Sequence, residues 1–134
     1  MDSGLALQRA LYQSVRTNAD VLSLLGGAKV YDDTPQRTDF PYVTFGRSVV
    51  RDWSTGTDAG HEHVVTLHVW SRSAGRKEAW QIMGAIQASL HDQGLAVEDH
   101  HLVNLRHEFS DVRREPDGDT YHGVVRFRAV TETM

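Results

Sequence analysis

Histidine is the residue type whose number and placement in this chain could most directly serve chemistry, because eight of the 134 residues are histidines. His61 and His63 would lie on the same side of a strand, and His100, His101 and His107 are close in the sequence. A zinc site needs three or four convergent ligands, usually in a recognisable spacing such as His-Glu-x-x-His. The chain contains neither that spacing nor a cysteine. We therefore expect no metal and no cofactor, and a small histidine-dependent metalloenzyme stays as an alternative that metal analysis would test.

Nucleophilic catalysis and phosphate binding have no recognisable motif either. The chain lacks a Gly-x-Ser-x-Gly elbow, and no Gly-Lys-Ser/Thr follows its glycines. The aspartates at 32, 33, 117 and 119 could bind a cation weakly, but turn formation explains them more simply. We therefore predict no catalytic residue and no enzymatic activity.

Length and composition predict an ordinary globular protein that forms a single domain over residues 1–134. Hydrophobic residues make up 40% of the chain and the formal net charge is −4, which argues against a generic nucleic-acid binder. No stretch approaches the roughly 18 consecutive apolar residues that a membrane span needs. The absence of cysteine and of a basic leader fits a cytosolic product that does not enter a membrane.

Three stretches of the sequence have apolar residues at helical spacing. They predict a helix over residues 4–17 with Ser3 as its cap, then a short helical turn capped by Asn18. The clearest amphipathic helix is predicted between a cap at Ser73 and a stop at Gly94.

Period-two alternation predicts two hairpins that alternate with the helices. The first joins a strand opened by Pro41 to a strand over residues 63–70, through a mobile loop at 51–60. The second joins residues 102–109 to residues 121–131 through a Pro-Asp-Gly turn. Helix, hairpin, helix, hairpin is therefore the predicted element order.

The predicted fold class is α+β, with a four-stranded, mainly antiparallel sheet and two helices packed on one face. Residues 29–31 could add a short strand. His107 shares the phase of the predicted core, so we expect a hydrogen-bonded histidine in or beside that core. The apolar phases of the predicted helices and strands give the core residues: Leu7, Leu11, Val15, Val43, Phe45, Val65, Leu67, Val69, Ile82, Met83, Ile86, Leu90, Val103, Leu105, Phe109, Val125 and Phe127.

The opposite face of the sheet is the candidate site. Tryptophan and arginine among small polar residues are typical of protein–protein contact surfaces, although an ordinary solvated face has a similar composition. The bulky residue of the 51–60 loop belongs to the same hypothesis. The candidate interface residues are Trp53, Thr66, His68, Trp70, Arg106, Arg126 and Arg128.

Several strings, including Thr-Leu-His-Val-Trp-Ser at 66–71, together resemble a family of small tail-completion, or tail terminator, proteins of long-tailed phages and gene transfer agents. The resemblance extends over about residues 5–132. Its strings are at residues 30–32, 35–36, 40–43, 60–63, 66–71, 102–106 and 117–129.

The resemblance implies a structural virion protein of the tail and neck, assembled in the bacterial cytoplasm. It implies a hexameric ring that caps the tail tube, ends polymerisation of the major tail protein and joins the tail to a head-side stopper or connector. DNA would pass through the lumen without specific binding. The alternative within phage assembly is a head-completion or stopper protein of the neck.

Overall fold

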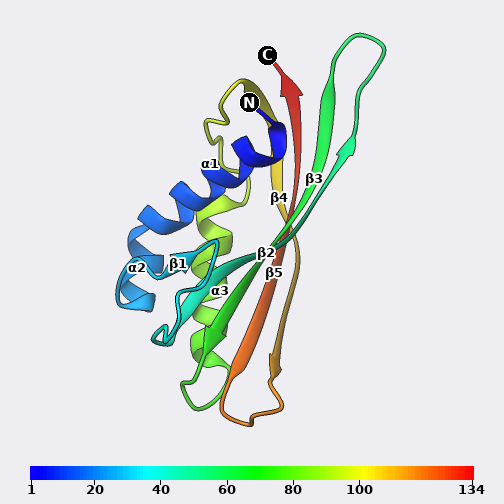
Figure 1. The fold of residues 1–134 in the computed structure, drawn as a ribbon. Helices are drawn as coiled ribbons and strands as arrows, with labels where there is room; N and C mark the ends of the chain where they lie inside the picture. The colour runs from blue at the N-terminus through cyan, green and yellow to red at the C-terminus, as the bar shows by residue number, and fades with distance from the viewer.

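The computed structural model describes residues 1–134 as a twisted sheet with all its helices on one face (Figure 1). The sheet order is β1-β2-β3-β5-β4, and every neighbouring pair is antiparallel except β1 with β2. In chain order the elements are α1 Ser3–Thr17, α2 Ala19–Leu25, β1 Val30–Tyr31, β2 Tyr42–Asp52, β3 Gly60–Ser71, α3 Lys77–Leu90, β4 His100–Arg114 and β5 Tyr121–Thr133.

The predicted α+β class is confirmed, but the structure has three helices and five strands rather than two and four. The extra strand is β1, where the buried Val30 pairs with Val43 at the sheet edge. The extra helix is α2, because the Asn18 side chain accepts backbone hydrogen bonds from Asp20 and Val21 and so starts a separate helix. No helix is long and apolar enough to cross a membrane.

Two of the predicted helix caps are wrong. The Asp2 carboxylate, not Ser3, accepts a hydrogen bond from the backbone N–H of Leu5 and caps α1. Ser73 lies before the start of α3, whose first turn has no side-chain cap. This helix ends at Leu90, ahead of the predicted stop at Gly94, because the chain turns back at this point and the N–H of Asp92 donates to Leu105 of β4 at 2.8 Å.

The hydrophobic core draws on all three helices and all five strands. Most of the predicted core residues are buried, and Phe45 is half-buried against Tyr12, with ring centroids 6.1 Å apart. His107 is a half-buried residue beside the core, as predicted: its ring lies edge-on to Phe127 and its Nε2 bonds the Ser110 hydroxyl at 2.7 Å.

Val103 and Phe109 were predicted to lie in the core, and this is wrong, because they are 44% and 42% exposed. The reason is a pair of register shifts in β4, one between Leu102 and Asn104 and one between His107 and Phe109. Each β-bulge adds one residue opposite β5 and so inverts the face on which the following residues lie. Simple alternation in the sequence carries no sign of either bulge.

The two hairpins project from opposite ends of the molecule (Figure 1). The β2–β3 hairpin extends past the helices beside the chain termini, and the β4–β5 turn lies at the far end. The loop between β2 and β3, predicted to be mobile, has a defined hydrogen-bond pattern. The backbone N–H of Trp53 donates to the carbonyl of Gly60 at 2.8 Å, and the backbone N–H of Thr55 donates to the carbonyl of Asp58 at 2.8 Å.

His63 is the one fully buried histidine, on the helix-covered face of β3. Its Nε2 lies 2.9 Å from the Thr131 hydroxyl, while its Nδ1 has no partner. Burial lowers the pKa of His63 from 6.5 to about 4. The folded protein therefore holds this side chain neutral in the core over the whole neutral range.

Phe127→Ala and Phe109→Ala form a matched pair that tests the bulges. Phe127 is fully buried, so its truncation should lower the free energy of unfolding by about 3–5 kcal/mol. Phe109→Ala should lower it by less than about 1 kcal/mol, because the ring is on the surface. Urea unfolding measures both values, and equal losses would contradict the register described for β4.

Acid should destabilise the protein through His63. In the unfolded chain the His63 imidazole is protonated below about pH 6.5, whereas in the folded chain it is protonated only below about pH 4. The free energy of unfolding should therefore fall between these pH values, by up to about 3 kcal/mol from this residue. His63→Gln should flatten the pH dependence, whereas the exposed control His101→Gln should leave it unchanged. A His63→Gln profile as steep as that of the unsubstituted protein would rule the mechanism out.

Candidate protein-contact surface

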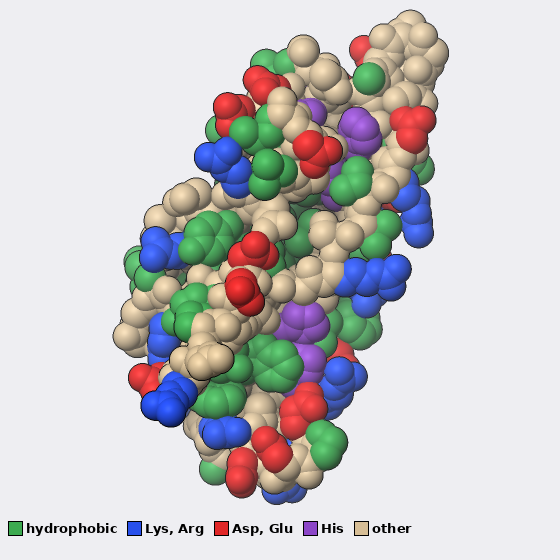
Figure 2. Space-filling model, viewed as in Figure 1, with side chains coloured by type: hydrophobic (Ala, Val, Ile, Leu, Met, Phe, Trp, Pro, Cys, Tyr) green, Lys and Arg blue, Asp and Glu red, His purple; other side chains and the backbone are tan.

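The helix-free face of the sheet consists of the side chains on β2 to β5 that point away from the helices. The alternation of β3 places Thr66, His68 and Trp70 on this face, since Leu67 and Val69 between them are buried in the core. Histidine side chains gather in two groups along the molecule in the space-filling view, and the lower group lies beside hydrophobic side chains (Figure 2).

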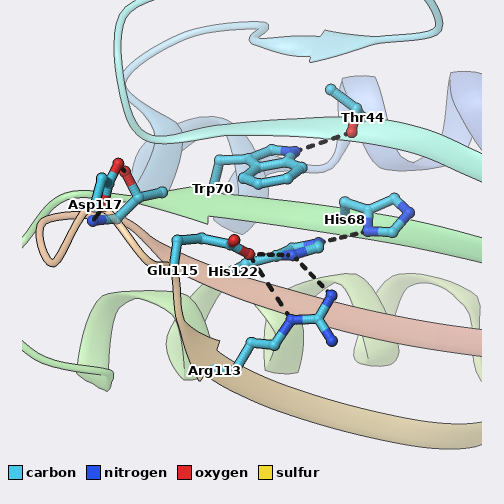
Figure 3. Close-up of polar contacts among 8 residues, drawn as sticks. Thr44, His68, Trp70, Arg113, Glu115, Asp117 and His122 are labelled. Carbon is cyan, nitrogen blue, oxygen red and sulfur yellow. Dashed lines mark hydrogen bonds and ion pairs between the residues drawn. The ribbon is translucent and has the colours of Figure 1, made fainter.

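One part of this face is a compact set that we call the histidine–tryptophan cluster: Thr44, His68, Trp70, Glu115 and His122 (Figure 3). The indole of Trp70 stacks on the His122 ring, with centroids 3.9 Å apart and planes 11° apart. Its Nε1 donates to the Thr44 hydroxyl at 3.1 Å. Strands β2, β3 and β5 are therefore tied together on the helix-free face, and Trp70 is held within its own chain.

A line of short polar contacts extends through the cluster. The Nδ1 of His68 lies 2.6 Å from the Nε2 of His122, and the Nδ1 of His122 lies 2.8 Å from a carboxylate oxygen of Glu115. With both rings neutral, His122 donates to Glu115 and His68 donates to His122. A side-chain carbon at Gly46 would overlap the His68 ring, so glycine on β2 is what allows this ring its position.

The electrostatics of the cluster favour neutral histidines. Burial lowers the pKa of both His68 and His122, and Glu115 opposes the shift at His122. The Arg113 guanidinium, 3.8 Å from the Glu115 carboxylate, lowers both pKa values further. No group of three or more His, Cys, Asp or Glu side chains is placed to hold a metal ion. The contacts of the cluster hold β2, β3 and β5 together.

A second group of predicted residues lies at the end of the face beside the β2–β3 loop. The Arg128 guanidinium bonds the Glu62 carboxylate at 2.8 Å and lies 5.4 Å from the centre of the Trp53 ring. Trp53 remains 53% exposed. This end of the face thus exposes the Trp53 ring, which packs against Arg128, an arginine that is itself paired with Glu62.

The remaining predicted residues are not brought into one site. Arg126 lies over the exposed Phe109 ring at 4.9 Å, between the two groups. Arg106 is 3.8 Å from Asp92 at the β4 edge, and Thr66 is buried in the middle of the face. The predicted set is therefore spread along the face rather than gathered at one place.

Sequence reasoning missed His122, Glu115, Thr44 and Phe109. His122 shares the period-two phase of Arg126 and could have been found from it. Glu115 belongs to the turn after β4, and its contact with His122 depends on the turn geometry. Nothing in the sequence reports that geometry.

These features define a class: a small α+β protein with a helix-backed sheet and an exposed face rich in aromatic and arginine side chains. The sequence model of the family described as "Tail completion protein gp17" matches residues 9–132. The chain belongs to this family of structural tail proteins.

Individual relatives agree with this placement. The tail completion protein gp17 of Bacillus phage SPP1 is 24% identical over 124 residues, 92% of this chain and 90% of the relative. A chain in the structure of the virion of a native gene transfer agent particle has a TM-score of 0.89 and 31% identity over 97% of both chains. The SPP1 gp17 structure has a TM-score of 0.63 at 21% identity, covering 98% of this chain and 90% of that one, and shows the shared fold alone.

Glu115→Gln should lower the pKa of His122, because the amide keeps a hydrogen-bond acceptor but removes the negative charge that favours the imidazolium. Histidine ring signals followed by NMR across a pH titration would measure the shift. Asp119→Asn is the matched control, since this exposed carboxylate in the same turn does not contact the cluster. An unchanged His122 pKa in Glu115→Gln would contradict the polar line described above.

Proposed function

We propose that this protein is a particle component that forms a ring on the end of the tail tube, ends polymerisation of the major tail protein and joins the tail to a head-side stopper or connector. The observation that carries the proposal is the likeness to a chain of the gene transfer agent particle, at 31% identity over 97% of both chains. Such a likeness over the full length favours a common place in a tailed particle.

The shape of the subunit supports a role at a junction. Its two hairpin ends project in opposite directions (Figure 1), so one subunit could contact the tube at one end and the connector at the other. A ring requires one surface of each subunit to meet a different surface of the next. The helix layer and the helix-free face supply chemically different sides for such contacts, and six subunits is the number that the family resemblance suggests.

No catalytic step is part of the proposal. We infer that the protein works by shape and contact, as a structural family suggests. DNA would pass through the ring without specific binding, and the net charge of −4 per chain is consistent with weak attraction for phosphate. Assembly would take place in the bacterial cytoplasm before the tail joins the head.

The purified protein should bind tail tubes that lack it and should stop their further growth. Tubes and DNA-filled heads, each from particles lacking the protein, would be incubated with it and pelleted, and tube lengths would be measured by electron microscopy. Binding to tubes first is the expected result. Binding to filled heads before tubes would instead favour a stopper or head-completion protein.

Two tryptophans of similar exposure provide the matched variants for this assay. Trp53, 53% exposed at the hairpin end, should be a contact residue, so Trp53→Ala should weaken tube capping about tenfold or more. Trp80, 48% exposed on α3, is the control, and Trp80→Ala should leave capping unchanged. Equal effects of the two substitutions would exclude the hairpin end as the tube-binding surface.

A further inference from the structure

Strand β2 leaves most of its outer edge unpaired. Strand β1 covers it only at Val43 and Thr44, through the pairs Val30 with Val43 and Tyr31 with Thr44. From residue 46 to residue 52 the outer backbone groups have no partner on a neighbouring strand of the chain. An open edge of this kind is a template for pairing with another strand.

Strand β4 is the opposite edge, and the chain itself covers its middle. The turn after α3 reaches it twice: the N–H of Asp92 donates to the carbonyl of Leu105 at 2.8 Å, and the N–H of His107 donates to the His91 ring at 2.9 Å. Nearer its start, His100 donates to the carbonyl of Val97 at 3.0 Å. Beyond the second bulge, residues 108–114 have no such cover.

The two open stretches have compatible directions. Because β2, β3, β5 and β4 alternate in direction across the sheet, β2 and β4 run opposite ways. A copy rotated about an axis along the strands would therefore place its β4 antiparallel to the neighbouring β2. The open stretches lie at opposite ends of the sheet, so the strands must be inclined to that axis, as they are in closed barrels.

Side chains favour one register for pairing between the open stretch of β2 and the open stretch of β4 in a second copy. With Arg51 opposite Asp111, a cation faces a carboxylate on the helix-free face. The same register places Val50, which is 42% exposed, opposite Val112 on the helix side. A shift that brings Arg51 opposite Arg113 would instead put two like charges together. Arg51 is free to make the pair, since its side chain is 69% exposed and its contact with Glu62 is 3.7 Å long.

We propose that residues 48–52 of one chain pair antiparallel with residues 110–114 of a second copy, with Arg51 opposite Asp111 and Val50 opposite Val112. The joint rests on the proposed ring and specifies the contact that builds it. Neighbouring helix-free faces then form one continuous surface around the ring.

Because the chain has no cysteine, single cysteines can test the joint directly. Arg51→Cys and Asp111→Cys proteins would be mixed in equal amounts on tail tubes, oxidised and separated on a non-reducing gel. The mixture should give a cross-linked dimer, and neither variant alone should do so. Arg51→Cys mixed with Arg113→Cys is the matched control, on the same strand and face, and it should cross-link at least about tenfold more slowly.

Charge exchange provides an independent measurement in the reduced protein. Arg51→Asp and Asp111→Arg should each reduce ring formation on tubes, and the protein carrying both substitutions should restore it. Both positions can be changed without touching the core, and thermal unfolding would confirm that each variant folds.

Three outcomes would overturn the joint. These are cross-linking of Asp111→Cys to itself, equal yields with Arg113→Cys, and failure of the double charge exchange to restore rings. Electron microscopy separates this failure from failure of the proposed function. Tubes that are capped by rings but show no 51–111 cross-link would support the proposed ring and contradict the proposed strand pairing. Absence of rings from the unsubstituted protein would instead remove the proposed function itself.

Discussion

The unbroken antiparallel pairing of β3 with β5 is the constraint on which the rest of the structure depends. Every residue from Gly60 to Ser71 has a partner on β5, without a register shift. Because side chains alternate strictly along such a ladder, this pairing fixes which residues of the two central strands meet the helices. Val65, Leu67, Val125 and Phe127 form the buried side, and the helix-free face is what remains on the other side.

The outer strands depart from this regularity. Both β2 and β4 contain register shifts, and both supply exposed side chains and open backbone, whereas the central strands have neither shifts nor open edges. In the proposed ring, folding and assembly would thus use different parts of the sheet. A substitution at Phe127 acts on the core, while one at Phe109 acts on a surface that the second bulge of β4 has turned outward.

This division explains what the sequence could predict. Alternation and helical spacing depend on local burial, so both hairpins, α1 and α3 could be recognised from them. Val103 and Phe109 were misplaced because a bulge is a property of the strand pair and leaves no mark in one strand alone. The contact of Glu115 with His122 was not predicted for a similar reason, since it joins a turn to a strand and depends on the folded geometry. Trp70 and His68 were correctly placed on the helix-free face, but their packing within the chain was not predicted.

The histidine–tryptophan cluster connects the two roles of the sheet. By tying β2, β3 and β5 on the helix-free face, it stiffens that face where no helix supports it. A stiff face would matter in the proposed ring, because a small change of sheet twist in each subunit would accumulate around the closed circle and move the last edge away from the first. The cluster need not touch a neighbour to serve assembly. In the proposed ring it would set the twist at which the open edges of successive subunits meet.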